Sequence, residues 1–98
     1  MNEKEAYRQK IEAQIDEWKA EMDKLNARAK KLEAEGRIEA ESRIQDLQAR
    51  QEAARAKLEE LRRAGDAAWK DVKEGLDRAV SELGDAVQDA ASKFSKER

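Results

Sequence analysis

The sequence contains no cysteine, no proline and no histidine, and aromatic residues make up only 4% of its 98 positions. Without cysteine there is neither a disulfide framework nor a thiolate, and without cysteine or histidine the usual ligands of zinc and copper are absent. No apolar run approaches the roughly 20 residues that a membrane-crossing helix needs. We therefore expect no metal site, no cofactor and no membrane-spanning segment.

The first residues, Met-Asn-Glu-Lys-Glu, carry mixed charge and lack the apolar region of a signal peptide. We therefore expect a cytoplasmic location. Charged side chains make up 45% of the chain, against a usual share of about 25%. The 21 basic and 23 acidic side chains nearly cancel, which leaves a formal charge of −2. This balance argues against a strongly basic surface for nucleic acid, so we expect no nucleic-acid partner.

The prevailing residues are Ala, Glu, Lys, Arg, Gln and Leu, which are strong helix formers. No segment shows the alternation or the β-branched richness of a strand. The sequence therefore predicts an all-α fold in a single helical coiled-coil domain over residues 1–98.

The first apolar seam has residues separated alternately by four and three positions, which is the heptad spacing of a coiled coil. It consists of Ile11, Ile15, Trp18, Met22, Leu25, Ala29 and Leu32. A second seam repeats this rhythm with its frame displaced by one residue. It consists of Ala40, Ile44, Leu47, Gln51, Ala54, Leu58 and Leu61. The displacement lies beside Gly36, where it marks either a discontinuity in one helix or a turn.

The two seams match when the chain is aligned antiparallel about Gly36, which places Leu25 beside Leu47 and Ile11 beside Leu61. Two architectures give this pairing: a monomeric hairpin that turns near Gly36, and an antiparallel homodimer of long unbroken helices. The residues around Gly36 tolerate a helix and include no loop-forming Asn, Asp, Ser or Pro. We therefore expect one long helix over residues 2–64 and a homodimer. A break at Gly36, giving a three-helix bundle, is the alternative.

A turn is predicted at Gly65-Asp66, because basic residues, then Gly, then Asp mark the end of one helix and the start of the next. An amphipathic helix is predicted over residues 67–96, with a stripe that drifts towards an 11-residue rhythm. The stripe consists of Trp69, Val72, Leu76, Val80, Leu83, Val87, Ala90 and Phe94. Because Gly75 and Gly84 weaken this helix, we expect it to fold back against the long helix, with Trp69 near Leu61 and Leu83 near Leu47.

Catalytic patterns are missing from the sequence. No serine lies in a nucleophile elbow or has a histidine to act as its base, and the carboxylates lie among Lys and Arg on helix faces. Trp18 and Trp69 both follow the helical apolar spacing, which is typical of core anchors rather than of a ligand cage. We therefore expect no enzyme.

Two stretches of the chain, Glu5–Leu25 and Leu58–Leu76, resemble small bacterial coiled-coil proteins, some of which are grouped as stress-response proteins. The resemblance implies a non-enzymatic protein and brings no catalytic residues. The last third also resembles the 11-residue amphipathic repeats of late-embryogenesis-abundant proteins and exchangeable apolipoproteins.

These observations favour a bacterial stress-response protein that acts through helix–helix self-association or protein interaction. The large residues of the first two seams would form the interaction seam. The alternative is a conditional protein whose last helix coats a membrane or a dehydrated surface. The two hypotheses differ in whether Trp69, Val72 and Leu83 are buried in the free protein.

Overall fold

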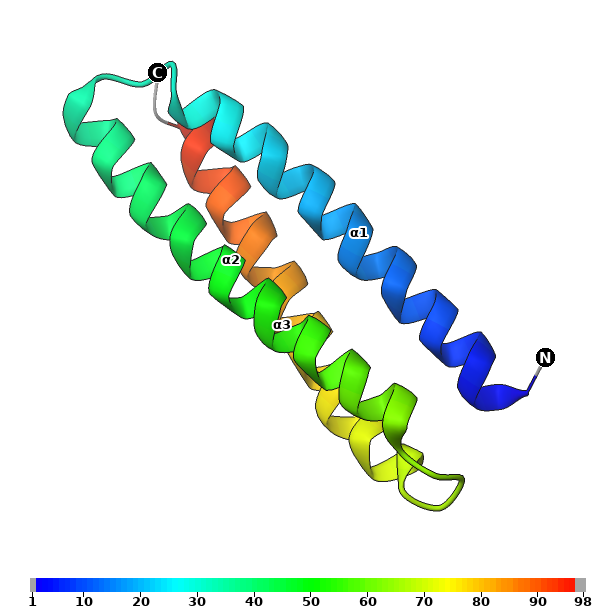
Figure 1. The fold of residues 1–98 in the computed structure, drawn as a ribbon. Helices are drawn as coiled ribbons and strands as arrows, with labels where there is room; N and C mark the ends of the chain where they lie inside the picture. Colours follow the sequence, from blue (N-terminus) through cyan, green and yellow to red (C-terminus); the bar gives the residue numbers. More distant parts are fainter. Residues whose placement is uncertain (1, 97–98) are drawn as a thin grey trace.

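Three long α-helices run up, down and up along one rod in the computed structural model, which describes residues 2–96 (Figure 1). Helix α1 spans Glu3–Ala29, α2 spans Ala34–Arg63 and α3 spans Trp69–Lys96. The rod measures 51 × 19 × 15 Å. The described residues contain no strand, so the all-α prediction is confirmed.

The single long helix predicted over residues 2–64 is wrong, because the chain turns at residues 30–33. The end of α1 tightens, with Lys31 N donating to Arg28 O at 3.1 Å and Leu32 N donating to Ala29 O at 3.1 Å. Helix α2 begins after Glu33, which is extended and serves as the N-cap. Gly36 lies inside the first turn of α2 and does not form the turn.

The core explains why the chain turns without a helix-breaking residue. Folding α2 back onto α1 buries the first two seams within one chain, and α3 covers both. One cluster of buried residues joins Met22, Leu25, Ala29, Ala40, Ile44, Leu47, Leu83, Val87, Ala90 and Phe94, with Leu32 packed against it. The other joins Ile11, Ile15, Ala54, Leu58, Leu61, Trp69, Leu76 and Val80, with Val72 packed against it. The antiparallel alignment about Gly36 thus pairs residues of the same cluster at Leu25 with Leu47 and at Ile11 with Leu61.

The connection between α2 and α3 includes Gly65 and Asp66, where the sequence predicts a turn. Gly65 O accepts from Ala68 N and from Trp69 N, both at 3.1 Å, so the turn leads directly into α3. No glycine with a positive φ occurs in the described residues, so Gly65 does not end α2 in a left-handed conformation. Instead, Lys4 Nζ donates to Ala64 O at 2.6 Å and to Arg62 O at 3.1 Å, and so satisfies carbonyl groups at the end of α2.

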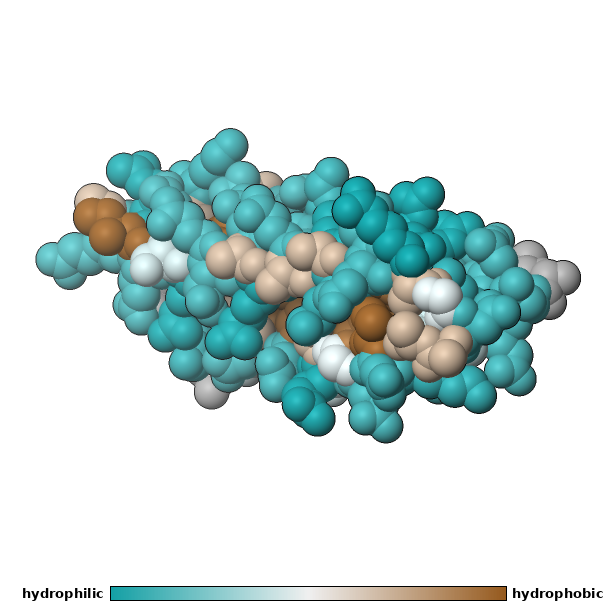
Figure 2. All heavy atoms as spheres, turned by 60° about the horizontal axis from the view of Figure 1, so that its bottom comes forward, coloured by the Kyte–Doolittle hydropathy of each residue, from teal (hydrophilic) through white to brown (hydrophobic). Residues whose placement is uncertain are grey.

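The surface is mostly hydrophilic on the face shown in Figure 2, with apolar atoms in small separate patches. Exposed ion pairs lie along the helices, such as Arg43–Glu39 at 3.2 Å and Arg50–Asp46 at 3.1 Å. Ile38, near the start of α2, is a large apolar side chain that stays 68% exposed. In the described part of the chain, no helix has an apolar stretch of the length that crossing a membrane requires.

Two isoleucines offer a direct test of this burial pattern. Ile15 is 0% exposed in the core, and Ile38 is 68% exposed. We expect Ile15→Ala to lower the free energy of unfolding by about 2–5 kcal/mol, because it leaves a cavity. Ile38→Ala should change it by less than about 0.5 kcal/mol. Urea unfolding followed by far-UV circular dichroism measures the free energy of unfolding of both variants. An equal loss of this free energy in both would contradict the arrangement of the helices.

Candidate functional site

The face between α1 and α3 is the most open of the three helix contacts. These two helices make less contact with each other than either makes with α2. Two cavities, of about 370 and 460 Å³, lie along this face, and Trp18 lines both. We call these two cavities together the Trp18 groove. It runs along α1 from Lys10 to Glu21 and along α3 from Asp77 to Ala91.

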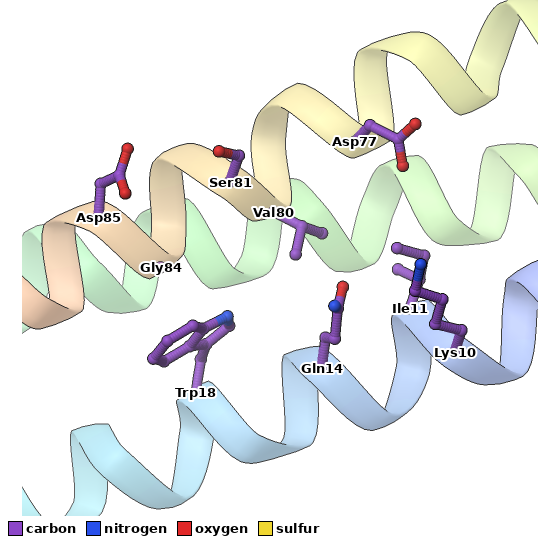
Figure 3. A pocket seen from close by; sticks show the side chains of 9 residues that line it. All are labelled: Lys10, Ile11, Gln14, Trp18, Asp77, Val80, Ser81, Gly84 and Asp85. Atoms are coloured by element: carbon purple, nitrogen blue, oxygen red, sulfur yellow. The ribbon is translucent and has the colours of Figure 1, made fainter.

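Trp18 crosses this groove and rests against the backbone of α3. Figure 3 shows its indole projecting from α1 towards Gly84. A Cβ atom placed on Gly84 would lie 2.8 Å from Trp18 Cζ2, which is closer than van der Waals contact allows. The absence of a side chain at Gly84 therefore lets the indole lie this close to α3. Sequence reasoning placed Trp18 in the core seam, whereas the structure leaves it partly buried at the groove.

The two cavities differ in polarity. The larger one has an apolar floor that consists of Trp18, Val87 and Ala91, and the exposed Ala20 also lines it. Glu17, Glu21 and Gln88 stand at its edge. The smaller cavity is mixed, with Ile11 and Val80 beside polar side chains from both helices. These polar side chains are Lys10, Gln14, Asp77, Ser81 and Asp85.

A group of side chains around Tyr7 shares Asp77 with the smaller cavity. The Tyr7 hydroxyl donates to the Asp77 carboxylate, and its oxygen also lies 3.3 Å from Lys73 O. The Tyr7 ring lies 6.2 Å from that of Trp69, and Lys73 Nζ lies 5.3 Å from the Tyr7 ring centroid. Burial raises the pKa of Tyr7, and the hydrogen bond and charge of Asp77 raise it further. The Tyr7 group thus ties the start of α1 to the start of α3.

Sequence reasoning did not predict Tyr7 or Gly84 as site residues, although the sequence around each contains an indication of its role. Tyr7 lies four positions before Ile11, about one helical turn away, although the alternating spacing of the first seam would continue at Arg8. Gly84 follows Leu83 at the edge of the α3 stripe, where a missing side chain leaves room for a large partner on α1. The sequence alone reads Gly84 only as a weak point in a helix.

The residues predicted as an interaction seam lie in the core of the chain itself. All of them are buried except Trp18 and Leu32, which are partly buried. The stripe of α3 is likewise buried except for Val72, which is partly buried. No cluster of three or more metal-ligating side chains occurs in the described residues, and every buried side-chain nitrogen or oxygen there has a hydrogen-bond partner. The Trp18 groove is therefore the feature from which a function can be inferred.

Comparisons with protein-family models, with curated proteins and with solved structures gave no match. The resemblance to stress-response coiled-coil proteins therefore stays a prediction.

The Tyr7 group should make the stability of the bundle sensitive to alkaline pH. Because its pKa is raised in the folded chain, the stabilisation from Tyr7 is complete below its ordinary pKa of about 10 and declines as the pH rises above it. Ultraviolet titration of the only tyrosine should give a midpoint above 10.

Tyr7→Phe is the matching variant. At neutral pH it should cost about 0.5–1 kcal/mol, because the hydrogen bond is partly exposed. Above pH 10 the variant should lose stability less steeply than the wild type in parallel urea unfolding. A tyrosine that titrates at its ordinary pKa contradicts the contact with Asp77.

The contact between Trp18 and Gly84 can be tested against a second glycine of the same helix. A Cβ on Gly75 would lie 3.6 Å from Lys57 Nζ, which is an ordinary contact. We expect Gly75→Ala to stabilise the chain by about 0.5–1 kcal/mol through helix propensity. Gly84→Ala should instead destabilise it by about 1–2 kcal/mol and shift tryptophan emission to the red, because the indole is pushed towards water. An equal gain in stability from both substitutions would rule out the close contact between Trp18 and Gly84.

Proposed function

We propose that this chain is a non-enzymatic helical-bundle protein that acts by helix–helix association with a second copy or with another protein. The observation that carries the proposal is the Trp18 groove. It combines a partly buried tryptophan with an apolar floor between two helices that no loop joins directly. Tryptophans in such positions often dominate the binding energy of protein interfaces. A role in the bacterial stress response, in the cytoplasm, is the part of the proposal that rests on the sequence resemblance.

The apolar seams support an association that leaves the bundle intact. Ile15 and Leu61 are each 0% exposed, so the chain already covers residues that a long-helix dimer would share. Opening the bundle to offer them would expose most of the core to water. A partner that binds at the Trp18 groove adds contacts without this cost.

The surrounding carboxylates fit a binding surface better than a reaction centre. Those elsewhere on α1 stand on exposed helix faces, and several form ion pairs, such as Arg8–Glu12 at 2.9 Å and Arg55–Asp16 at 3.1 Å. Exposed pairs of this kind are surrounded by solvent and contribute little to stability. A general acid or base needs a surrounding that moves its pKa towards the working pH.

The alternative function is a conditional amphipathic helix that coats membranes or dehydrated surfaces. It is favoured by the continuous apolar stripe of α3 and by its single short connection to α2. Trp69 is 8% exposed and Leu83 is 0% exposed in the free chain. This burial favours the folded bundle over a helix that waits for a surface.

One experiment separates the two functions. Far-UV circular dichroism and tryptophan emission are recorded on the whole chain, before and after the addition of anionic phosphatidylglycerol vesicles. We expect high helicity and blue-shifted emission without vesicles, and no change when vesicles are added. A rise in helicity together with an emission shift would overturn the proposal in favour of the surface-coating function. Sedimentation equilibrium over a range of concentrations then tells whether the partner is a second copy.

A further inference from the structure

We propose that the Trp18 groove binds an amphipathic helix of another protein that carries Lys or Arg beside its apolar stripe. The inference rests on the proposed protein-binding function and specifies the chemistry of the partner. It is carried by the shape of the groove, by its floor and by the charges on its rim.

The groove has the shape of a helix-binding site. Its α1 side, from Lys10 to Glu21, is about 17 Å long at 1.5 Å per residue, which is about three helical turns. Ala91 is a small, partly buried lining residue, so that another helix can approach closely there. A helix laid between α1 and α3 would complete a four-helix bundle and cover the exposed edge of Trp18.

The rim of the groove is acidic. Glu17, Glu21, Asp77 and Asp85 line the two cavities, and Lys10 is the lining residue with a positive charge. Glu21 lies 3.3 Å from Lys24, and Asp77 accepts from Tyr7. Within the described residues, Glu17 and Asp85 take part in no ion pair.

The positions of Glu17 and Asp85 specify the partner. Glu17 is adjacent to Trp18 on α1, and Asp85 is adjacent to Gly84 on α3. The two carboxylates therefore stand on opposite helices, Glu17 at the larger cavity and Asp85 at the smaller one. A helix with Leu-like residues against Trp18 and Val87 and with basic residues on both sides would match this pattern.

The same charges disfavour two other occupants. Two copies that met groove to groove would bring identical acidic rims together, and like charges at close range repel. An anionic membrane surface would meet the same repulsion, since interfacial helices usually bind it through Lys and Arg.

The test uses the whole chain and a synthetic peptide of about 14 residues, which is two heptads, with Leu at the a and d positions and Lys at the flanking positions. A matched peptide has Glu in place of every Lys. We expect calorimetry to detect binding of the Lys peptide and none of the Glu peptide. The change in tryptophan emission should disappear in Trp18→Phe, because Trp69 is only 8% exposed and lines neither cavity. No binding of the Lys peptide overturns the proposal.

A pair of double variants with equal charge separates the groove from general attraction. Glu17→Gln with Asp85→Asn should weaken binding of the Lys peptide by about fivefold, from the loss of two exposed ion pairs. Glu52→Gln with Glu60→Gln removes two exposed charges from α2 and should weaken it by less than about twofold. All four positions are exposed, and far-UV circular dichroism verifies the fold. Equal weakening by both doubles overturns the groove as the site.

The remaining outcomes separate a wrong partner from a wrong function. If Glu17→Gln with Asp85→Asn strengthens self-association in sedimentation equilibrium, a second copy occupies the groove. Helix–helix association then stands, but the basic partner does not. If phosphatidylglycerol vesicles change Trp18 emission more than the Lys peptide does, both the basic partner and the protein-binding function are wrong.

Discussion

The whole structure depends on three narrow apolar stripes covering one another. Each helix is mostly charged on its surface, and the chain has few large apolar residues, with aromatics at only 4%. A pair of such helices would leave one side of every stripe in water. Helix α3 solves this problem because its stripe meets both seams, with Leu83 in the same cluster as Leu25 and Leu47, and Leu76 in the same cluster as Ile15. Burial of each such side chain is worth about 1.5–3 kcal/mol, far more than the preference of any one residue for helix or turn.

That difference in magnitude explains what sequence reasoning could and could not predict. The heptad spacing places the residues of both seams, and their antiparallel alignment anticipates which ones share a cluster. Basic residues followed by Gly65 and Asp66 locate the second connection. The first connection carries no such signal, because Lys30, Lys31, Leu32 and Glu33 all tolerate a helix. Tertiary packing overrides this local preference, and the one-residue displacement of the seams beside Gly36 is the only trace of the turn.

The Trp18 groove was beyond prediction for a related reason. Periodicity places Trp18 on the seam but does not reveal that its indole lies partly exposed between α1 and α3. The position of the indole depends on Gly84, which is 66 positions away and whose missing side chain has meaning only once α1 and α3 lie together. The Tyr7 group depends in the same way on Asp77, which accepts a hydrogen bond from Tyr7. Asp77 lies on α3, and no local sequence pattern indicates that this helix contacts α1.

The chain connectivity also gives the bundle a preferred order of assembly. Turns at residues 30–33 and 64–68 join α2 to both neighbours, so those two contacts form by closing short loops. Contacts between α1 and α3 have no such loop, and the hydrogen bond from Tyr7 to Asp77 joins residues 70 positions apart. This is the face with the largest sequence separation and the least contact between helices. We therefore expect it to form last during folding and to separate first in partial unfolding, with the helix ends around Tyr7 exchanging amide hydrogens before the middle of α2.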